Sequence, residues 1–359
     1  MSVFKKIFLL WFFYLLSINI YVWFLALLGV TPVTNLKELL FGVWGYGWDG
    51  MHYLRIATLG YKFPLQAFFP LYPLLIKFFH VFLPLTLSYR INALLLLPTL
   101  FVIYFLALLI GFKKNEALKA LVVFLLFPTG FFLQANYAET LYILVSGLGL
   151  ISILKKKYFL AAFLAGILSS VKITGISLGI IVIVSFILEN KKDIKSVFKL
   201  MGIGLLSFAG LFAYFYFLNL KFGTFEIFFR AQEEWGRGTG LSFYGFFGYL
   251  LPIYRLFGSW DAFRKFLELI IFVFALFMLK KTFHKSPFPI WAFCLLNVVI
   301  PVSTGNLMSF NRFALMSFPL IIYFSKYIKT KKEFIVYSSL GILLQMVGIY
   351  MFINGVFAG

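Results

Sequence analysis

The chain is divided into long apolar stretches by short tufts of lysine, and this pattern restricts its fold more than any other feature. A helix that crosses a membrane needs roughly 20 mostly apolar residues. The stretches that meet or approach this length are residues 7–29, 90–112, 117–134, 137–154, 158–171, 173–188, 198–219, 264–281, 287–302, 310–327 and 333–354. We therefore predict an all-α polytopic membrane protein, with about eleven spans (range about 10–12) and one domain over residues 1–359.

Composition excludes a soluble globule. Apolar residues make up 62% of the chain and charged residues 12%, whereas a soluble domain is about 25% charged. So much apolar side chain cannot be covered in water, and we expect lipid to be the solvent of most of the chain.

The basic residues predict how the chain is oriented. The net charge is +20, but the lysines form tufts between apolar stretches and no basic helix face of the kind that follows a nucleic acid. Tufts of this kind mark the cytoplasmic side of a membrane. They are Lys5-Lys6, Lys113-Lys114, Lys155-Lys156-Lys157, Lys191-Lys192, Lys280-Lys281 and Lys329 to Lys332. We expect a cytoplasmic N-terminus that leads into an uncleaved first span, in a membrane best matched by a prokaryotic plasma membrane.

The segment 67–89 is apolar enough to cross the membrane, but a crossing here would invert every later loop and destroy the lysine asymmetry. Pro70 and Pro73 interrupt it near its start. We therefore predict a broken, re-entrant or surface segment on the outer side, since irregular backbone at membrane depth is tolerated where protein buries it.

Scarce polar side chains gather in the connections that this topology places outside, above all in 31–66 and 220–263, which we expect to form the catalytic face. In the first connection, Asp49, His52 and Arg55 follow one another at three-residue spacing. If 50–59 is a helix, Asp49 is a natural N-cap with the other two on the same face. A second interpretation makes Asp49 a general base beside a histidine and a cation at the membrane interface. Spacing alone does not separate the two.

Several motifs resemble those of the PIG-V family of membrane mannosyltransferases, which belong to the GT-C superfamily. Their order along the chain also agrees. The motifs are Trp48-Asp49-Gly50-Met51-His52-Tyr53-Leu54-Arg55, Ala67-Phe68-Phe69-Pro70-Leu71-Tyr72-Pro73, Asn136-Tyr137-Ala138-Glu139-Thr140-Leu141-Tyr142, Ala231-Gln232 with Trp235-Gly236-Arg237, and Ser309 to Arg312. An arginine that the family often shows near the sixth span is matched only by Lys172.

The resemblance implies an inverting transfer of mannose, or a similar hexose, from a polyprenyl-phosphate sugar to a lipid or glycan acceptor on the non-cytoplasmic side. Asp49 would be the catalytic base and His52 would orient it or contact the acceptor. A phosphate leaving group needs cations, for which Lys172, Arg237 and Arg312 are the candidates. The full set expected to bind substrate is His52, Arg55, Tyr137, Glu139, Lys172, Gln232, Arg237 and Arg312.

No cofactor is expected beyond the lipid-linked sugar, because the outer carboxylates and the few histidines show no metal-ligand spacing. A divalent ion between Asp49 and Glu139 is the less favoured alternative. The main rival from another class is a transporter or flippase of lipid-linked sugars, although the sequence shows no repeated halves. Related transferases with paired acids in the first loop fit less well, since Gly50 follows Asp49.

Overall fold

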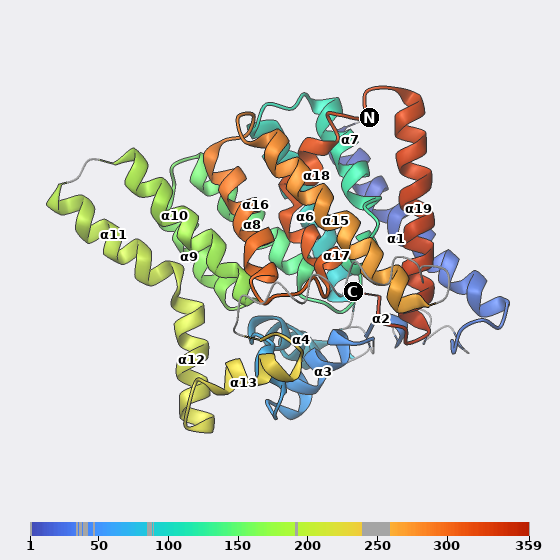
Figure 1. Cartoon of the computed structure of the whole chain (residues 1–359), viewed down its shortest axis with the longest axis horizontal. Helices are drawn as coiled ribbons and strands as arrows, with labels where there is room; N and C mark the ends of the chain where they lie inside the picture. The colour runs from blue at the N-terminus through green and yellow to red at the C-terminus, as the bar shows by residue number, and fades with distance from the viewer. Residues whose placement is uncertain are drawn as a thin grey trace.

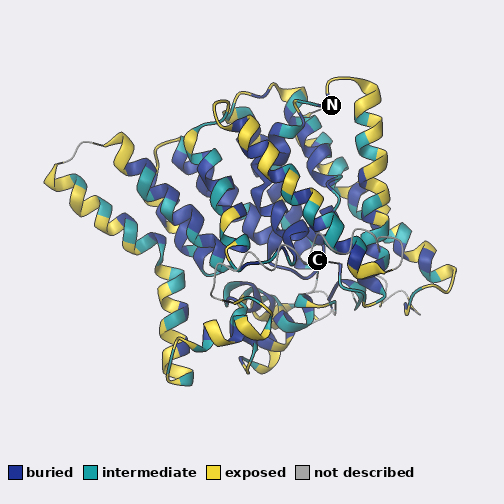
Figure 2. Ribbon diagram, viewed as in Figure 1, coloured by how far each residue is buried: buried dark blue, intermediate teal, exposed yellow. Residues whose placement is uncertain are grey.

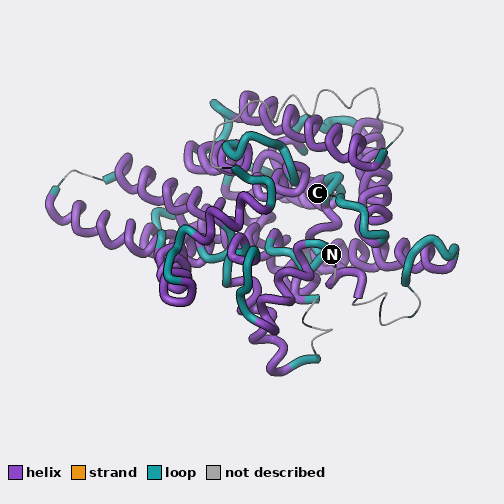
Figure 3. Tube along the Cα trace, turned by 60° about the horizontal axis from the view of Figure 1, so that its bottom comes forward, coloured by secondary structure: helices purple, strands orange, loops and turns teal. Residues whose placement is uncertain are grey.

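The computed structural model of the chain describes residues 2–358, except 34, 36, 37, 39–41, 46, 85–87, 89, 191, 192 and 239–258. Its α-helices are α1 (Val3–Leu27), α2 (Val43–Gly45), α3 (Asp49–Leu59), α4 (Leu71–Phe82), α6 (Ile91–Leu109), α7 (Lys114–Leu125), α8 (Glu139–Leu154), α9 (Tyr158–Ser169), α10 (Ile176–Glu189), α11 (Ile194–Ser207), α12 (Ala209–Phe222), α13 (Ile227–Glu234), α15 (Trp260–Thr282), α16 (Phe288–Val302), α17 (Phe310–Phe313), α18 (Phe318–Phe324) and α19 (Lys331–Ile353). Short 3-10 helices join them: η2 (Leu65–Ala67), η3 (Gly130–Leu133), η4 (Ile173–Gly175) and η6 (Ala314–Ser317). Figure 3 shows helices and loops, and no strand, in the described part.

The predicted all-α class is confirmed, and every predicted apolar stretch contains a helix. By length and composition, α1, α6 and α19 could each cross a membrane, and α11 with α12 would add a fourth span if the bent pair counts as one. The other apolar helices are shorter. The total of about eleven crossings therefore stays a prediction.

The predicted span 198–219 is broken where it packs on α9. Helices α11 and α12 meet at an angle of 53°. A Cβ atom on Gly166 of α9 would lie 2.3 Å from the carbonyl oxygen of Leu206, and one on Gly210 of α12 would lie 2.2 Å from that of Gly166. Only glycine permits backbones to approach this closely, so the two helices bend around a backbone contact with α9.

The helices form a bundle with distinct ends (Figure 1). The N-terminus and the starts of α7 and α19 lie at one end, while α3, α4 and α13 lie at the other. Large apolar side chains are exposed on α1, α11 and α12, among them Phe13, Phe198 and Leu220 (Figure 2). A soluble protein rarely exposes so many of these side chains, whereas lipid covers them at no cost.

The segment predicted to be broken at its prolines forms η2 and then α4, which lies beside α3 at the end of the bundle rather than among the long helices (Figure 1). In the second polar connection, α13 lies at the same end. Residues 239–258 of that connection lie outside the described residues.

Candidate active site

A cavity of about 810 Å³ lies at the end of the bundle where α3 and α13 approach the helices. Its wall is built from segments far apart in the sequence. Its polar lining includes Asp49, His52, Lys172, Thr174, Gln232, Glu234, Arg237, Ser303, Thr304, Ser309 and Arg312, and its apolar lining includes Trp48, Phe68, Phe69, Phe228, Phe229, Trp235, Ile300, Phe313 and Phe357. Charged groups beside an apolar wall suit a ligand that carries both a polar head and a lipid tail.

Asp49 enters this cavity from a tightly held turn. Trp48 is the N-cap of α3, with φ of 44°, and Asp49 is the first residue of the helix. The backbone N–H of Asn136 donates to the Trp44 carbonyl (2.8 Å), and its side-chain amide donates to the Gly50 carbonyl (3.2 Å). The hydroxyl of Tyr72 donates to the Asn136 amide oxygen (2.9 Å). Asn136 thereby fastens the Asp49 turn to the start of α8.

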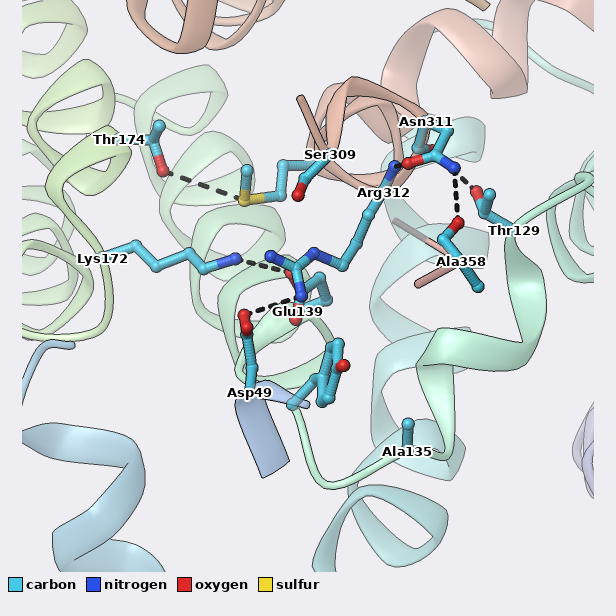
Figure 4. A network of polar contacts seen from close by, with 12 residues as sticks. Asp49, Thr129, Ala135, Glu139, Lys172, Thr174, Ser309, Asn311, Arg312 and Ala358 are labelled. Atoms are coloured by element: carbon cyan, nitrogen blue, oxygen red, sulfur yellow. Dashed lines mark hydrogen bonds and ion pairs between the residues drawn. The ribbon is translucent and has the colours of Figure 1, made fainter. Parts of the chain in front are cut away.

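Four charged side chains form a connected cluster beside the cavity (Figure 4). The Arg312 guanidinium contacts Asp49 Oδ2 through Nη1 (2.7 Å) and Glu139 Oε1 through Nε (3.1 Å). Lys172 Nζ reaches the same Glu139 oxygen at 2.5 Å. Because Arg312 and Glu139 are almost fully buried, each needs a partner of opposite charge. Asp49, at 21% exposed, is the carboxylate of this cluster that faces the cavity.

Aromatic rings form the wall next to Asp49. The ring of His52 lies 4.8 Å from that of Trp235 and 5.2 Å from that of Phe68, and the Trp235 indole N–H donates to the Pro64 carbonyl. Burial lowers the pKa of His52 below its ordinary value; the Asp49 carboxylate opposes this shift and Arg55 adds to it. We therefore expect a neutral imidazole at pH 7.

Most of the residues expected at the site are brought together, and the list of cavity-lining members is Asp49, His52, Lys172, Gln232, Arg237 and Arg312. Tyr137 and Glu139 lie beneath the cavity, both almost fully buried and both against Arg312. Arg55 is exposed and is not among the lining residues. Three residues of α-helix rotate the chain by about 300°, so two such steps carry Arg55 about 120° away from Asp49. The predicted common face therefore holds for His52 but fails for Arg55.

The prediction of Asp49 as an N-cap is also wrong, because its carboxylate pairs with Arg312 and Trp48 takes the N-cap position. Sequence reasoning missed three residues of the site: Asn136, Trp235 and Phe313. The first two stand in the motifs quoted above, and Phe313 directly follows Arg312. Among the described residues, no group of three or more His, Cys, Asp or Glu side chains is placed to hold a metal ion. The expectation that the reaction needs no metal ion stays a prediction.

Helices that are apolar enough to cross a membrane, together with a cavity lined by both charged and apolar side chains, define a membrane protein with a candidate binding site. The chain belongs to the mannosyltransferase (PIG-V) family, whose model matches residues 27–249. The resemblance found in the sequence is thereby confirmed, and the protein is a membrane mannosyltransferase, hence a glycosyltransferase. No curated protein and no solved structure gives a significant match to the chain.

Proposed function

We propose that the protein, as a GT-C-type transferase, moves mannose from a polyprenyl-phosphate sugar to a lipid or glycan acceptor on the non-cytoplasmic face, with inversion at the anomeric carbon. The observation that carries the proposal is the position of Asp49, which lines the cavity while Arg312 holds its carboxylate at 2.7 Å. A carboxylate held in this way can take a proton from a bound hydroxyl without first having to reorient.

In the proposed step, the acceptor hydroxyl oxygen attacks the anomeric carbon of mannose, and its proton passes to Asp49. The new carbon–oxygen bond forms as the bond from that carbon to the phosphate oxygen breaks. The electron pair leaves with the polyprenyl phosphate, which changes from a phosphodiester monoanion to a monoester dianion. Lys172, Arg237 and Arg312 line the same cavity and would stabilise this added charge.

The apolar wall of the cavity supports a donor that carries a sugar and a prenyl chain. The rings of Phe68 and Trp235, next to His52, offer an apolar surface to one face of the sugar. Phe228 and Phe229 of α13 and Ile300 of α16 would contact the prenyl chain.

The orientation of the bundle supports an outer location of the site. The end that holds the cavity lies opposite the starts of α7 and α19, which carry lysines (Figure 1).

The test is reconstitution of the purified protein in liposomes with polyprenyl-phosphate mannose and candidate lipid acceptors. Asp49→Asn should lower turnover at least about a thousandfold, the loss expected when a base and its positioning are removed together. Asp261→Asn is the matched control, because Asp261 is 60% exposed and does not line the cavity. Near-normal turnover by the Asp49→Asn variant would exclude Asp49 as the base. Activity with a nucleotide sugar alone would exclude the proposed donor.

A further inference from the structure

One aromatic ring at the site is in contact with three cationic side chains. Phe313, the last residue of α17, lines the cavity and is 7% exposed. Arg237 lies 4.7 Å from the centroid of its ring, Lys172 4.8 Å and Arg312 5.4 Å. In the described part of the chain, no other ring lies against more than one cation.

The three cations come from separate elements. Lys172 precedes η4, Arg237 follows the end of α13, and Arg312 belongs to α17. Because all three lie close to one ring centroid, no two of them can be much more than about 10 Å apart. Like charges repel at this separation. An aromatic ring has no net charge, but the negative potential over its faces attracts each of the three cations.

Two of the three cations also pair with carboxylates. Glu139 pairs with Lys172 and Arg312, and Asp49 pairs with Arg312. Arg237 instead donates to the Met308 carbonyl at 3.2 Å. Glu234 also lines the cavity, but the described contacts include no ion pair between it and these cations. Whatever their other partners, all three cations lie against the ring of Phe313 in the wall of the cavity.

We propose that Phe313 is a positioning residue whose ring gathers Lys172, Arg237 and Arg312 into one anion-binding cluster. The identification of the anion as the phosphate of a lipid-linked donor rests on the proposed function. The cluster itself rests only on the cation–ring contacts. The ring does not touch the reacting atoms in this scheme; it sets the spacing of the cations that do.

The experiment compares Phe313→Leu with Phe313→Tyr in detergent-purified protein, with farnesyl phosphate and its neutral counterpart farnesol as probes. Leucine is apolar but has no aromatic ring, whereas tyrosine retains the ring and its π face. We expect Phe313→Leu to raise the Kd of farnesyl phosphate about tenfold and Phe313→Tyr to restore tight binding. The Kd of farnesol should stay unchanged in both. In the transfer assay, the KM for polyprenyl-phosphate mannose should rise more than kcat falls.

Phe310→Leu is the matched control, because Phe310 is 1% exposed in the same short helix and packs against Phe272 instead of a cation. Phe313→Met replaces the leucine variant if that one does not fold, as judged by its thermal midpoint. Equal binding of farnesyl phosphate by Phe313→Leu and the parent would overturn the inference. So would an equal loss for farnesol or for Phe310→Leu, and so would a parent that does not bind farnesyl phosphate. A parent that binds farnesyl phosphate but does not use polyprenyl-phosphate mannose would instead refute the proposed function.

Discussion

Arg312 links the groups of the site at the scale of single residues. It is 5% exposed and contacts two carboxylates that come from different helices, Asp49 of α3 and Glu139 of α8. An uncompensated charge in such a place is very costly, so the position of each member depends on the others. Glu139 is better described as the internal partner of Lys172 and Arg312 than as a group that meets substrate, since it is 1% exposed.

At the same scale, His52 predicts a dependence of stability on pH. Its pKa is lowered in the folded protein from an ordinary value of 6.5, chiefly by burial. As the pH falls below 6.5, the unfolded chain therefore takes up a proton before the folded protein does, and stability falls until the lower folded pKa is passed. The thermal midpoint of the parent should drop more steeply between pH 7 and pH 5 than that of His52→Gln. Parallel curves for the two proteins would contradict this expectation.

Much of the candidate site could be predicted because charges are scarce in this chain, and Asp49, Lys172, Arg237 and Arg312 are conspicuous in apolar surroundings. Two aspects could not be predicted. The side of α3 that meets the cavity depends on how that helix packs, so it was not known that Arg55 would lie outside the lining, and the burial of Glu139 depends on where α8 packs. Phe313 was hidden for a different reason: one phenylalanine among fifty carries no signal of its own.

At the scale of elements, α17 owes its position to contacts from other helices and from the C-terminal segment. Ser309 precedes it in a left-handed conformation (φ 65°), and the Ser309 backbone N–H donates to Glu268 Oε1 of α15 at 2.7 Å. Thr129 donates to the Asn311 carbonyl, and the Asn311 side chain donates to the Ala358 carbonyl (Figure 4). Hydrogen bonds thus hold α17 both at Ser309, which precedes it, and at Asn311, which is next to Arg312 within it.

Glu268 is the buried member of this support, and Arg264 donates to both of its carboxylate oxygens at 2.8 Å. Glu268→Ala removes a buried ion-pair partner and the acceptor of Ser309, so it should cost about 3–5 kcal/mol of stability. Asp261→Asn removes the exposed partner of the same arginine and should cost no more than about 1 kcal/mol. Thermal midpoints in detergent will compare the two. Equal losses of stability in the two variants would mean that burial of an ion pair does not determine how much the pair stabilises the fold.

The presence of the helices was predictable for a related reason: apolar length determines where a membrane helix can form, and each stretch identified in the sequence contains one. The bend between α11 and α12 was not predictable, because it depends on the contact of Gly210 with Gly166 on another helix. The same applies to the split of 310–327 into α17, η6 and α18. Interruptions of this kind arise from tertiary packing, which local composition does not report.

At the scale of the whole molecule, the cavity and the lysine tufts should face opposite sides of the membrane. The only cysteine, Cys294, is buried, so single exposed cysteines can be introduced with little background. In intact cells, Arg55→Cys should react with a membrane-impermeant maleimide, whereas Lys331→Cys should react only after permeabilisation. Both positions are exposed in the folded chain. Labelling of both from the same side would rule out the proposed orientation.

The close packing of the turn at Gly50 limits how this enzyme can diverge. A Cβ atom there would lie 2.7 Å from the Gly45 carbonyl oxygen and 3.4 Å from Asn136. A side chain directly after Asp49, such as a second acid, therefore requires the Gly45 carbonyl or the start of α3 to move. A homologue with two adjacent carboxylates at this point should therefore hold the second acid on a turn of different backbone geometry from the one at Gly50.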